Sequence, residues 1–190
     1  MEEKISVKII LASTREGRKG EWVARYIQSR ADKRSDWHVE LLDLKEWDLP
    51  FYTSAKLPAM QKYDSERVKK WSREIDSTDA FIIVTPEYNH GYPAPLKNAL
   101  DTLYNEWVRK AVAFVGYGGQ AGGSRAIEQL KQVVLELQMA PAYEDIIIPR
   151  IRKAFDEQGN STNPHLAEEV ETMFEDLNWW ARALKAAREQ

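Results

Sequence analysis

The chain has 190 residues and a mass of 22.0 kDa, with 27 basic and 30 acidic side chains and a formal charge of −3. With 43% hydrophobic residues, this length suits one core, so residues 1–190 are expected to form a single domain. The absence of cysteine excludes disulfides, thiolate nucleophiles and cysteine-held metal clusters. The three histidines, His38, His90 and His165, are too scattered to predict a metal site.

Three further features bear on partners and location. The near-neutral charge argues against a nucleic-acid binder, which normally carries a basic face. No apolar run approaches the ~18 residues of a membrane span. The first residues, 1–4, lead directly into a strand-like pattern and lack the layout of a signal peptide. We therefore expect a soluble, cytoplasmic protein without a nucleic-acid or membrane partner.

Apolar runs suited to strands alternate with segments of helical period along the chain. Ile5–Leu11 predicts a first strand, and residues 37–42 predict a second. The helix between them has an apolar stripe of Trp22, Val23, Tyr26, Ile27 and Ala31. An irregular stretch over 45–64 precedes a helix over about 65–76, on which Val68, Trp71 and Ile75 align.

The second half of the chain continues the alternation. Residues 80–85 and 111–115 are apolar on both faces, which is typical of strands inside a parallel sheet. Pro95 suits the first turn of a helix. A second helix places Ile127, Leu130, Val134 and Leu137 three and four residues apart. Ile146–Ile148 predicts a fifth strand, and a tryptophan-rich helix over 165–189 completes the fold.

Five strands that alternate with five helices predict a doubly wound α/β sandwich of three layers. Right-handed crossovers leave few topologies, and a five-stranded parallel sheet in the flavodoxin-like order 2-1-3-4-5 suits the chain best. Ligands of such sheets bind at the carboxyl ends of the strands, near the switch between strands 1 and 3. The loops after strands 1, 3 and 4 therefore form the candidate site.

The loop after the first strand, residues 12–20, carries hydroxyls, two glycines and three cations before a helix N-terminus. This combination predicts a phosphate cradle. No Gly-Lys-Ser/Thr sequence closes the loop, so a nucleoside triphosphate is not expected. The alternative is that Ser13 or Thr14 only caps the helix and that the cations are merely solvated.

The loop after the third strand, residues 85–95, has three prolines and a glycine that restrict its backbone. Tyr88 offers an aromatic face and Asn89 an amide, so the loop can hold a planar ring edge-on through backbone groups. The alternative is a rigid connection whose aromatic rings only pack. His90 is predicted to be a turn residue or part of the mouth rather than a catalytic base.

The loop after the fourth strand, residues 116–124, is rich in glycine, which lets backbone amides approach a ligand closely. Gly116, Gly118 and Ala121 match a dinucleotide pattern, but they follow the wrong strand for it. Ser124 lies too far beyond the strand for a nucleophile elbow and is predicted to be a helix N-cap. A phosphate cradle, a ring-edge loop and a wall of amides together favour a mononucleotide with a flat head, namely FMN.

With these motifs, the chain resembles the NADPH-dependent FMN reductase family, a flavodoxin-like group that includes chromate, azo-dye and quinone reductases. The resemblance covers residues 5–148 and is densest over 13–18 and 86–101, with a further match over 117–123. Ala12 and Gly116 stand where the family more often has Gly and Ser. The helix over 165–189 lies outside the resemblance.

The resemblance implies a set of FMN-binding residues in the three loops. The phosphate would be surrounded by Ser13, Thr14, Arg15, Arg18 and Gly20. The isoalloxazine ring and ribityl chain would run along Pro86, Glu87, Tyr88 and Asn89. The pyrimidine side of the ring would contact Tyr117, Gly118 and Gly119. Lys97, Asn98 and Asp101 would be structural, as residues that cap and brace their helix.

The resemblance also implies a ping-pong reaction, in which NAD(P)H delivers a hydride to flavin N5 and a quinone, azo compound, metal oxyanion or flavin then takes the electrons. The cofactor would carry this chemistry, so no side chain is assigned as a catalytic acid or base. NADPH and NADH both remain open as co-substrate, and the physiological acceptor is not predicted.

Two alternatives from other classes are a flavodoxin-type electron carrier and a flavin redox sensor, neither of which turns over NAD(P)H. Carriers are usually strongly acidic and lack arginine in the phosphate loop, so the charge of −3 with Arg15 and Arg18 favours the enzyme. Family members are usually homodimers or homotetramers. The apolar segment 47–63 is expected to pack against a partner chain, unless it folds over its own core.

Overall fold

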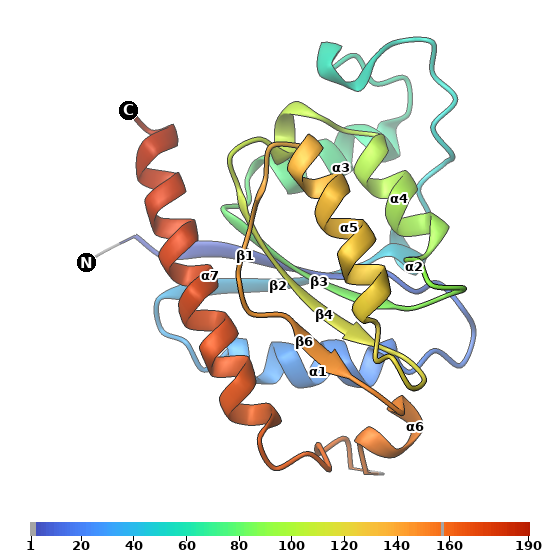
Figure 1. Ribbon diagram of the computed structural model, residues 1–190. Coiled ribbons are helices and arrows are strands. Elements are labelled where there is room, and N and C mark those ends of the chain that lie inside the picture. Colours follow the sequence, from blue (N-terminus) through green and yellow to red (C-terminus); the bar gives the residue numbers. More distant parts are fainter. Residues whose placement is uncertain (1–2, 157) are drawn as a thin grey trace.

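The computed structural model describes residues 3–156 and 158–190 as a three-layer sandwich (Figure 1). The sheet has the order β2-β1-β3-β4-β5, and β6 also pairs with β4. All these strand pairings are parallel. The predicted flavodoxin-like order 2-1-3-4-5 is therefore confirmed.

The strands follow the apolar runs of the sequence. Their bounds are β1 Ile5–Leu11, β2 Trp37–Asp43, β3 Ala80–Pro86, β4 Ala111–Tyr117, β5 Ala140–Pro141 and β6 Ile146–Ile148. Every residue of β3 and β4 is buried, because helices cover both faces at the centre of the sheet. Their pairing ends with Pro86 beside Tyr117, so the two loops that follow begin side by side.

Helices cover both faces of the sheet. Their bounds are α1 Gly20–Ala31, α2 Leu44–Trp47, α3 Glu66–Asp76, α4 Ala94–Asp101, α5 Ser124–Glu136, α6 Ile151–Ala154 and α7 Leu166–Arg188, with 3₁₀ turns at Pro58–Met60 and Asn105–Trp107. The apolar stripes of α1 and α7 pack on one face, and those of α3, α4 and α5 pack on the other. In the described part of the chain, no helix is both long enough and apolar enough to cross a bilayer.

The fifth position of the sheet differs from the prediction of one strand. Two short strands share it, with β5 beside the amino end of β4 and β6 beside its carboxyl end. The chain leaves the sheet between them because the Tyr143 N–H donates to Asp176 of α7 at 2.6 Å and Asp145 pairs with Lys131 of α5 at 2.6 Å. These two ties interrupt the edge strand.

Two local expectations were wrong. The stretch over 45–64 is not wholly irregular, because Asp43 accepts a hydrogen bond from the Lys45 N–H and so begins α2 directly after β2. The N-cap of α5 is Gly123, and Ser124 is its first helical residue. Gly123 has a φ of 97°, and a Cβ there would lie 2.6 Å from the backbone nitrogen of Tyr117. Only glycine fits this position.

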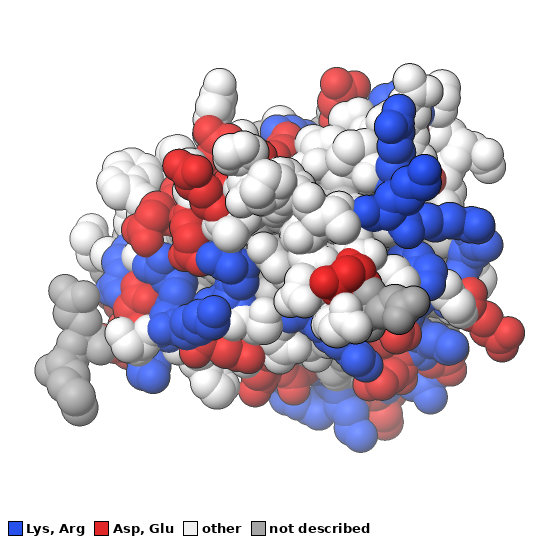
Figure 2. All heavy atoms as spheres, turned by 90° about the horizontal axis from the view of Figure 1, so that it is seen from below, with Lys and Arg blue, Asp and Glu red and all other residues white. Residues whose placement is uncertain are grey.

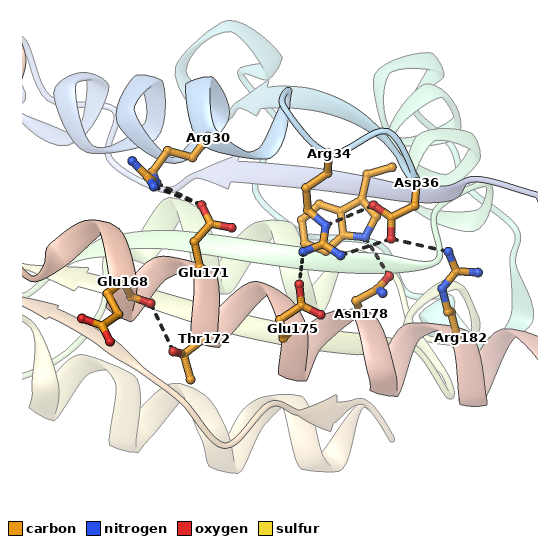
Figure 3. A network of polar contacts seen from close by, with 10 residues as sticks. Arg30, Arg34, Asp36, Glu168, Glu171, Thr172, Glu175, Asn178 and Arg182 are labelled. Carbon is orange, nitrogen blue, oxygen red and sulfur yellow. Dashed lines mark hydrogen bonds and ion pairs between the residues drawn. The ribbon is translucent and has the colours of Figure 1, made fainter.

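The C-terminal helix α7 is tied to α1 and β2 by polar contacts (Figure 3). Arg34 binds Glu175 at 2.6 Å and Asp36 at 3.1 Å, while Arg30 binds Glu171 at 3.1 Å. The indole N–H of Trp37 donates to Asn178 at 2.8 Å. These contacts, together with the buried stripe of α7, set the helix beside α1 and complete that layer of the sandwich.

Lys110 caps a helix at the opposite edge of the sheet from the candidate site. Its Nζ donates to the carbonyl oxygens of Ile75 and Asp76 at 2.7 Å each, which satisfies the C-terminus of α3. The residue is buried, and this burial lowers the pKa of its ammonium group to about 8.

This pKa predicts the sign of one pH effect. Because the folded pKa lies below the ordinary value of 10.5, the unfolded chain binds more protons between pH 8 and 10.5, and stability rises with pH across that window. The neutral amine still donates to both carbonyls. We expect the free energy of unfolding of the wild type, relative to Lys110→Met, to increase by about 3 kcal/mol from about pH 7 to about pH 11. Urea unfolding of both proteins at a series of pH values measures this difference in stability. A difference that does not change with pH would contradict the effect of burial on the Lys110 pKa.

Candidate functional site

The loops after β1, β3 and β4 surround one cavity of about 500 Å³ at the carboxyl edge of the sheet. Its lining consists of Ser13, Arg15, Glu16, Gly17, Arg18, Lys19, Trp22, Pro86, Glu87, Tyr88, Tyr117, Gly118, Gly119, Ile151 and Arg152. Four of these residues are basic. Figure 2 shows a group of basic side chains at the upper right of this face, with acidic and basic side chains interspersed over most of the rest. The cavity thus combines a positive wall with a glycine-rich one.

The loop between β1 and α1 offers unused backbone donors. The N–H groups of Ser13, Thr14, Gly17 and Gly20 make no hydrogen bond to any residue within 3–156 or 158–190. Gly17 has a φ of 63°, which lets the loop turn, and α1 begins at Gly20. Free N–H groups at a helix N-terminus attract anions. This geometry suits the predicted phosphate cradle.

Arg18 lines the cavity, but its guanidinium is already occupied. It binds both oxygens of Asp43, at the end of β2, and Glu21 at 2.9 Å, and it donates to the carbonyl of Ser13. The side chain is only 6% exposed. Arg18 therefore stabilises the loop of the cradle through these contacts.

Two other cations of the cradle are free of carboxylates. The guanidinium of Arg15 lies 5.6 Å from the centre of the Tyr88 ring, and the Nζ of Lys19 lies 3.8 Å from that of Trp22. Within the described residues neither has an ion pair. Both remain available to an anionic ligand.

The loop after β3 is joined to both other loops. The hydroxyls of Tyr88 and Ser13 are hydrogen-bonded at 2.7 Å, which links this loop to the cradle. The carboxylate of Glu87 is 7% exposed and pairs with Arg125 in the first turn of α5. The loop after β4 is held in turn by β6, since the Gly118 N–H donates to the Ile148 carbonyl at 3.1 Å.

Tyr117 lies at the base of the cavity, and the surroundings of its hydroxyl indicate whether an anion fits there. Its hydroxyl is buried near Ser13 but makes no hydrogen bond of normal geometry in the described part of the chain. A Cβ on Gly20 would lie 2.3 Å from this oxygen, so the hydroxyl sits against the first residue of α1. Burial raises the pKa of Tyr117, which keeps the hydroxyl protonated as a donor. A buried donor without a partner costs stability, and a phosphate oxygen would satisfy it.

The structure brings most of the predicted residues together. Nine of them line the cavity: Ser13, Arg15, Arg18, Pro86, Glu87, Tyr88, Tyr117, Gly118 and Gly119. Thr14 instead lines an adjacent hollow of about 350 Å³ with Phe51. Gly20 is buried under Tyr117, and Asn89 is exposed in a turn.

Trp22, Ile151 and Arg152 are lining residues that the sequence did not point to. Ile151 and Arg152 reach the cavity because the Ile151 and Arg150 N–H groups donate to the carbonyls of Gly118 and Gly119, at 3.0 and 2.6 Å. The sequence could have indicated Ile151 and Arg152, because they come just after the last strand of a parallel sheet. The carboxyl end of that strand lies at the same edge of the sheet as the three loops.

A parallel sheet of this order, with three loops gathered around one cavity at its carboxyl edge, defines a flavodoxin-like fold. Residues 5–151 match the NADPH-dependent FMN reductase family. The chain belongs to this family of oxidoreductases, which confirms the resemblance, the enzyme class and the prediction of FMN with NAD(P)H.

Individual relatives agree with this family. The chain is 39% identical over 153 residues to an NAD(P)H-dependent FMN reductase of Schizosaccharomyces pombe, which covers 77% of this chain and 76% of that protein. It is 32% identical over 124 residues to a probable NADPH:quinone oxidoreductase of Oryza sativa, covering 62% and 61%. The solved structure of FerB, an NAD(P)H:(acceptor) oxidoreductase from Paracoccus denitrificans, has the same fold, with a TM-score of 0.74, 24% identity and coverage of 92% and 97%.

The unpartnered hydroxyl predicts an unusual mutant. Tyr117→Phe removes a buried donor that has no partner, so the melting temperature of the flavin-free protein should stay unchanged or rise slightly. Its affinity for FMN and for inorganic phosphate should fall, by roughly tenfold for one lost hydrogen bond to a charged oxygen. Calorimetry and fluorescence titration measure these effects.

Tyr63→Phe is the matched control. The Tyr63 hydroxyl donates to the buried carboxylate of Glu106 at 2.5 Å, away from the cavity, so this variant should lose stability and keep its affinity for phosphate. Equal ligand affinity in Tyr117→Phe and the wild type would show that the hydroxyl faces no anion.

Proposed function

We propose that this chain is an FMN-dependent NAD(P)H oxidoreductase with a ping-pong reaction. A hydride, carrying two electrons, leaves NAD(P)H for the bound FMN, and a quinone, azo compound, metal oxyanion or free flavin then takes both electrons. The observation that carries the proposal is the convergence of three loops on one cavity, with free N–H donors and a buried unpartnered hydroxyl at its base. Membership of the FMN reductase family supports the same reaction.

The proposed roles follow the contacts of each residue. Ser13, Thr14, Gly20 and Arg15 would bind the phosphate, while Arg18, bound to Asp43, would hold the shape of their loop. Pro86, Glu87, Tyr88 and Asn89 would lie along the ring and ribityl chain. The backbone of Tyr117, Gly118 and Gly119 would bound the pyrimidine side of the ring, while the Tyr117 hydroxyl, which lies against Gly20, would donate to the phosphate.

FMN, when bound, supplies the hydride-accepting and electron-donating chemistry. The protein orients the ring between the loops after β3 and β4 and keeps its phosphate in the cradle. The basic side chains Arg15, Lys19 and Arg152 would attract the anionic nicotinamide dinucleotide to the same cavity. No side chain of the cavity is assigned a proton-transfer step.

The proposal also includes a homodimer or homotetramer. In segment 47–63, Trp47, Leu49 and Tyr63 pack against their own core, as the alternative expected. The middle of the segment does not pack against this core. Phe51, Leu57 and Met60 are 75%, 62% and 55% exposed. Figure 1 shows this middle part rising beyond α3 and α4, and Phe51 borders the hollow beside Thr14. A second copy that covers Phe51 would therefore wall the site.

The function is tested by anaerobic absorption spectroscopy of the protein loaded with FMN. We expect NADPH or NADH to bleach the flavin bands and a quinone to restore them over many cycles. One reduction followed by a stop would indicate a redox sensor, and bands that neither dinucleotide bleaches would indicate an electron carrier. Protein that takes up no FMN would remove the basis of the proposal.

Sedimentation velocity at micromolar concentration tests the oligomer. The wild type should sediment as a dimer or tetramer, and Phe51→Lys should shift it toward monomer because a charge replaces an exposed apolar anchor. Trp179→Lys is the control, since Trp179 is also exposed, at 64%, but lies on α7. A monomeric wild type would rule out this part of the proposal.

A further inference from the structure

The loop after β3 contains a strained two-residue turn at Asn89 and His90. Both have positive φ, 50° and 69°, as in a type I′ turn. Reciprocal backbone hydrogen bonds between Tyr88 and Gly91, 2.8 and 3.0 Å, close it. Asparagine and histidine adopt positive φ more often than most residues do, but two such residues in succession still cost free energy. The surrounding structure must therefore hold the turn.

Two residues of α5 supply this support from outside the turn. Arg125 binds the Glu87 carboxylate through its Nε at 2.6 Å, and its backbone N–H donates to the same carboxylate at 3.3 Å. One helical turn further along, Gln129 donates to the carbonyl oxygen of His90 at 3.0 Å. Positions four apart share one face of a helix, so both side chains reach the loop together.

The packing of Gly91 confirms how closely α5 approaches the turn. A Cβ at Gly91 would lie 3.0 Å from the Gln129 side-chain oxygen. The side chains of Asn89 and His90 make no hydrogen bond or ion pair with the rest of the described chain. The turn is thus held by its own backbone bonds and by α5.

We infer that Arg125 and Gln129 are positioning residues, which set the position of Tyr88 over the cavity and so orient the flavin ring. Neither side chain lines the cavity. This inference rests on the proposed function for its effect on the ring, and on the structure alone for the support of the turn. The phosphate cradle lies on another loop and is joined to this one by the Tyr88–Ser13 hydrogen bond, so the two residues should affect ring binding more than phosphate binding.

The test compares Arg125→Ala, Gln129→Ala and the double variant with Lys97→Ala. Lys97 pairs with Asp101 at 2.6 Å on α4, so its removal breaks a surface ion pair near the same loop without touching α5. In flavin-free protein, hydrogen exchange of the Tyr88 and Gly91 amides should accelerate by roughly tenfold in the double variant, because the turn opens more often. Lys97→Ala should leave this exchange unchanged.

With flavin, the double variant should bind FMN about tenfold more weakly and show an altered reduction midpoint potential and visible spectrum. Its melting temperature should fall below that of Lys97→Ala, because Arg125→Ala leaves the buried Glu87 carboxylate without its ion pair, and its affinity for inorganic phosphate should fall less than its affinity for FMN. Arg125→Lys should recover part of the FMN affinity, because it keeps the charge but loses the planar fork.

Several results would overturn the inference. Unchanged amide exchange would show that α5 does not hold the turn. Faster exchange with wild-type FMN affinity and potential would show that the turn does not orient the ring. Phosphate affinity that falls as far as FMN affinity would show a general structural effect. If the wild type takes up no FMN, the proposed function fails, and amide exchange still decides whether α5 supports the turn.

Discussion

The pairing of β3 with β4 is the constraint on which both the fold and the site depend. Both strands are buried on both faces, and they stay in register from Ala80 beside Ala111 to Pro86 beside Tyr117. A slip of one residue would turn Phe81 and Phe114 out of the cluster that they share. The same register ends the two strands together, and the Glu87 N–H then donates to the Tyr117 carbonyl at 3.2 Å. The core packing therefore also brings two walls of the cavity together.

The remaining wall, the cradle after β1, depends on a buried charge. Arg18 carries its guanidinium between the carboxylates of Asp43 and Glu21 and the carbonyl of Ser13. A buried cation is tolerable only when its donors are satisfied, and the planar fork of arginine satisfies both oxygens of Asp43 at once. This bond joins the loop to the end of β2 and leaves the backbone N–H groups of the loop free. The cradle can stay open because a side chain, rather than its own backbone, holds it.

The sequence was sufficient for the strand order, the three loops and most of the lining, because these follow from hydrophobic periodicity and from the geometry of parallel sheets. What it did not reveal depends on contacts between distant segments. Asp43 lies 25 residues from Arg18, and no local spacing connects them. The split of the edge into β5 and β6 follows from ties to α5 and α7, which override the local pattern. Ile151 reaches the cavity only through the carbonyl of Gly118, and short motifs do not encode such a contact.

The distribution of charge shows how far composition can be used to infer function. The whole chain carries a formal charge of −3, and α7 places Glu171 and Glu175 against the arginines of α1 and its following turn. The cavity instead gathers Arg15, Lys19 and Arg152. Of its two carboxylates, Glu87 is already neutralised by Arg125 and Glu16 is exposed to solvent. An anionic ligand responds to the field within a Debye length, about 8 Å at physiological ionic strength, rather than to the net charge. A slightly acidic protein can therefore present a basic site, and only the fold determines which charges face the ligand.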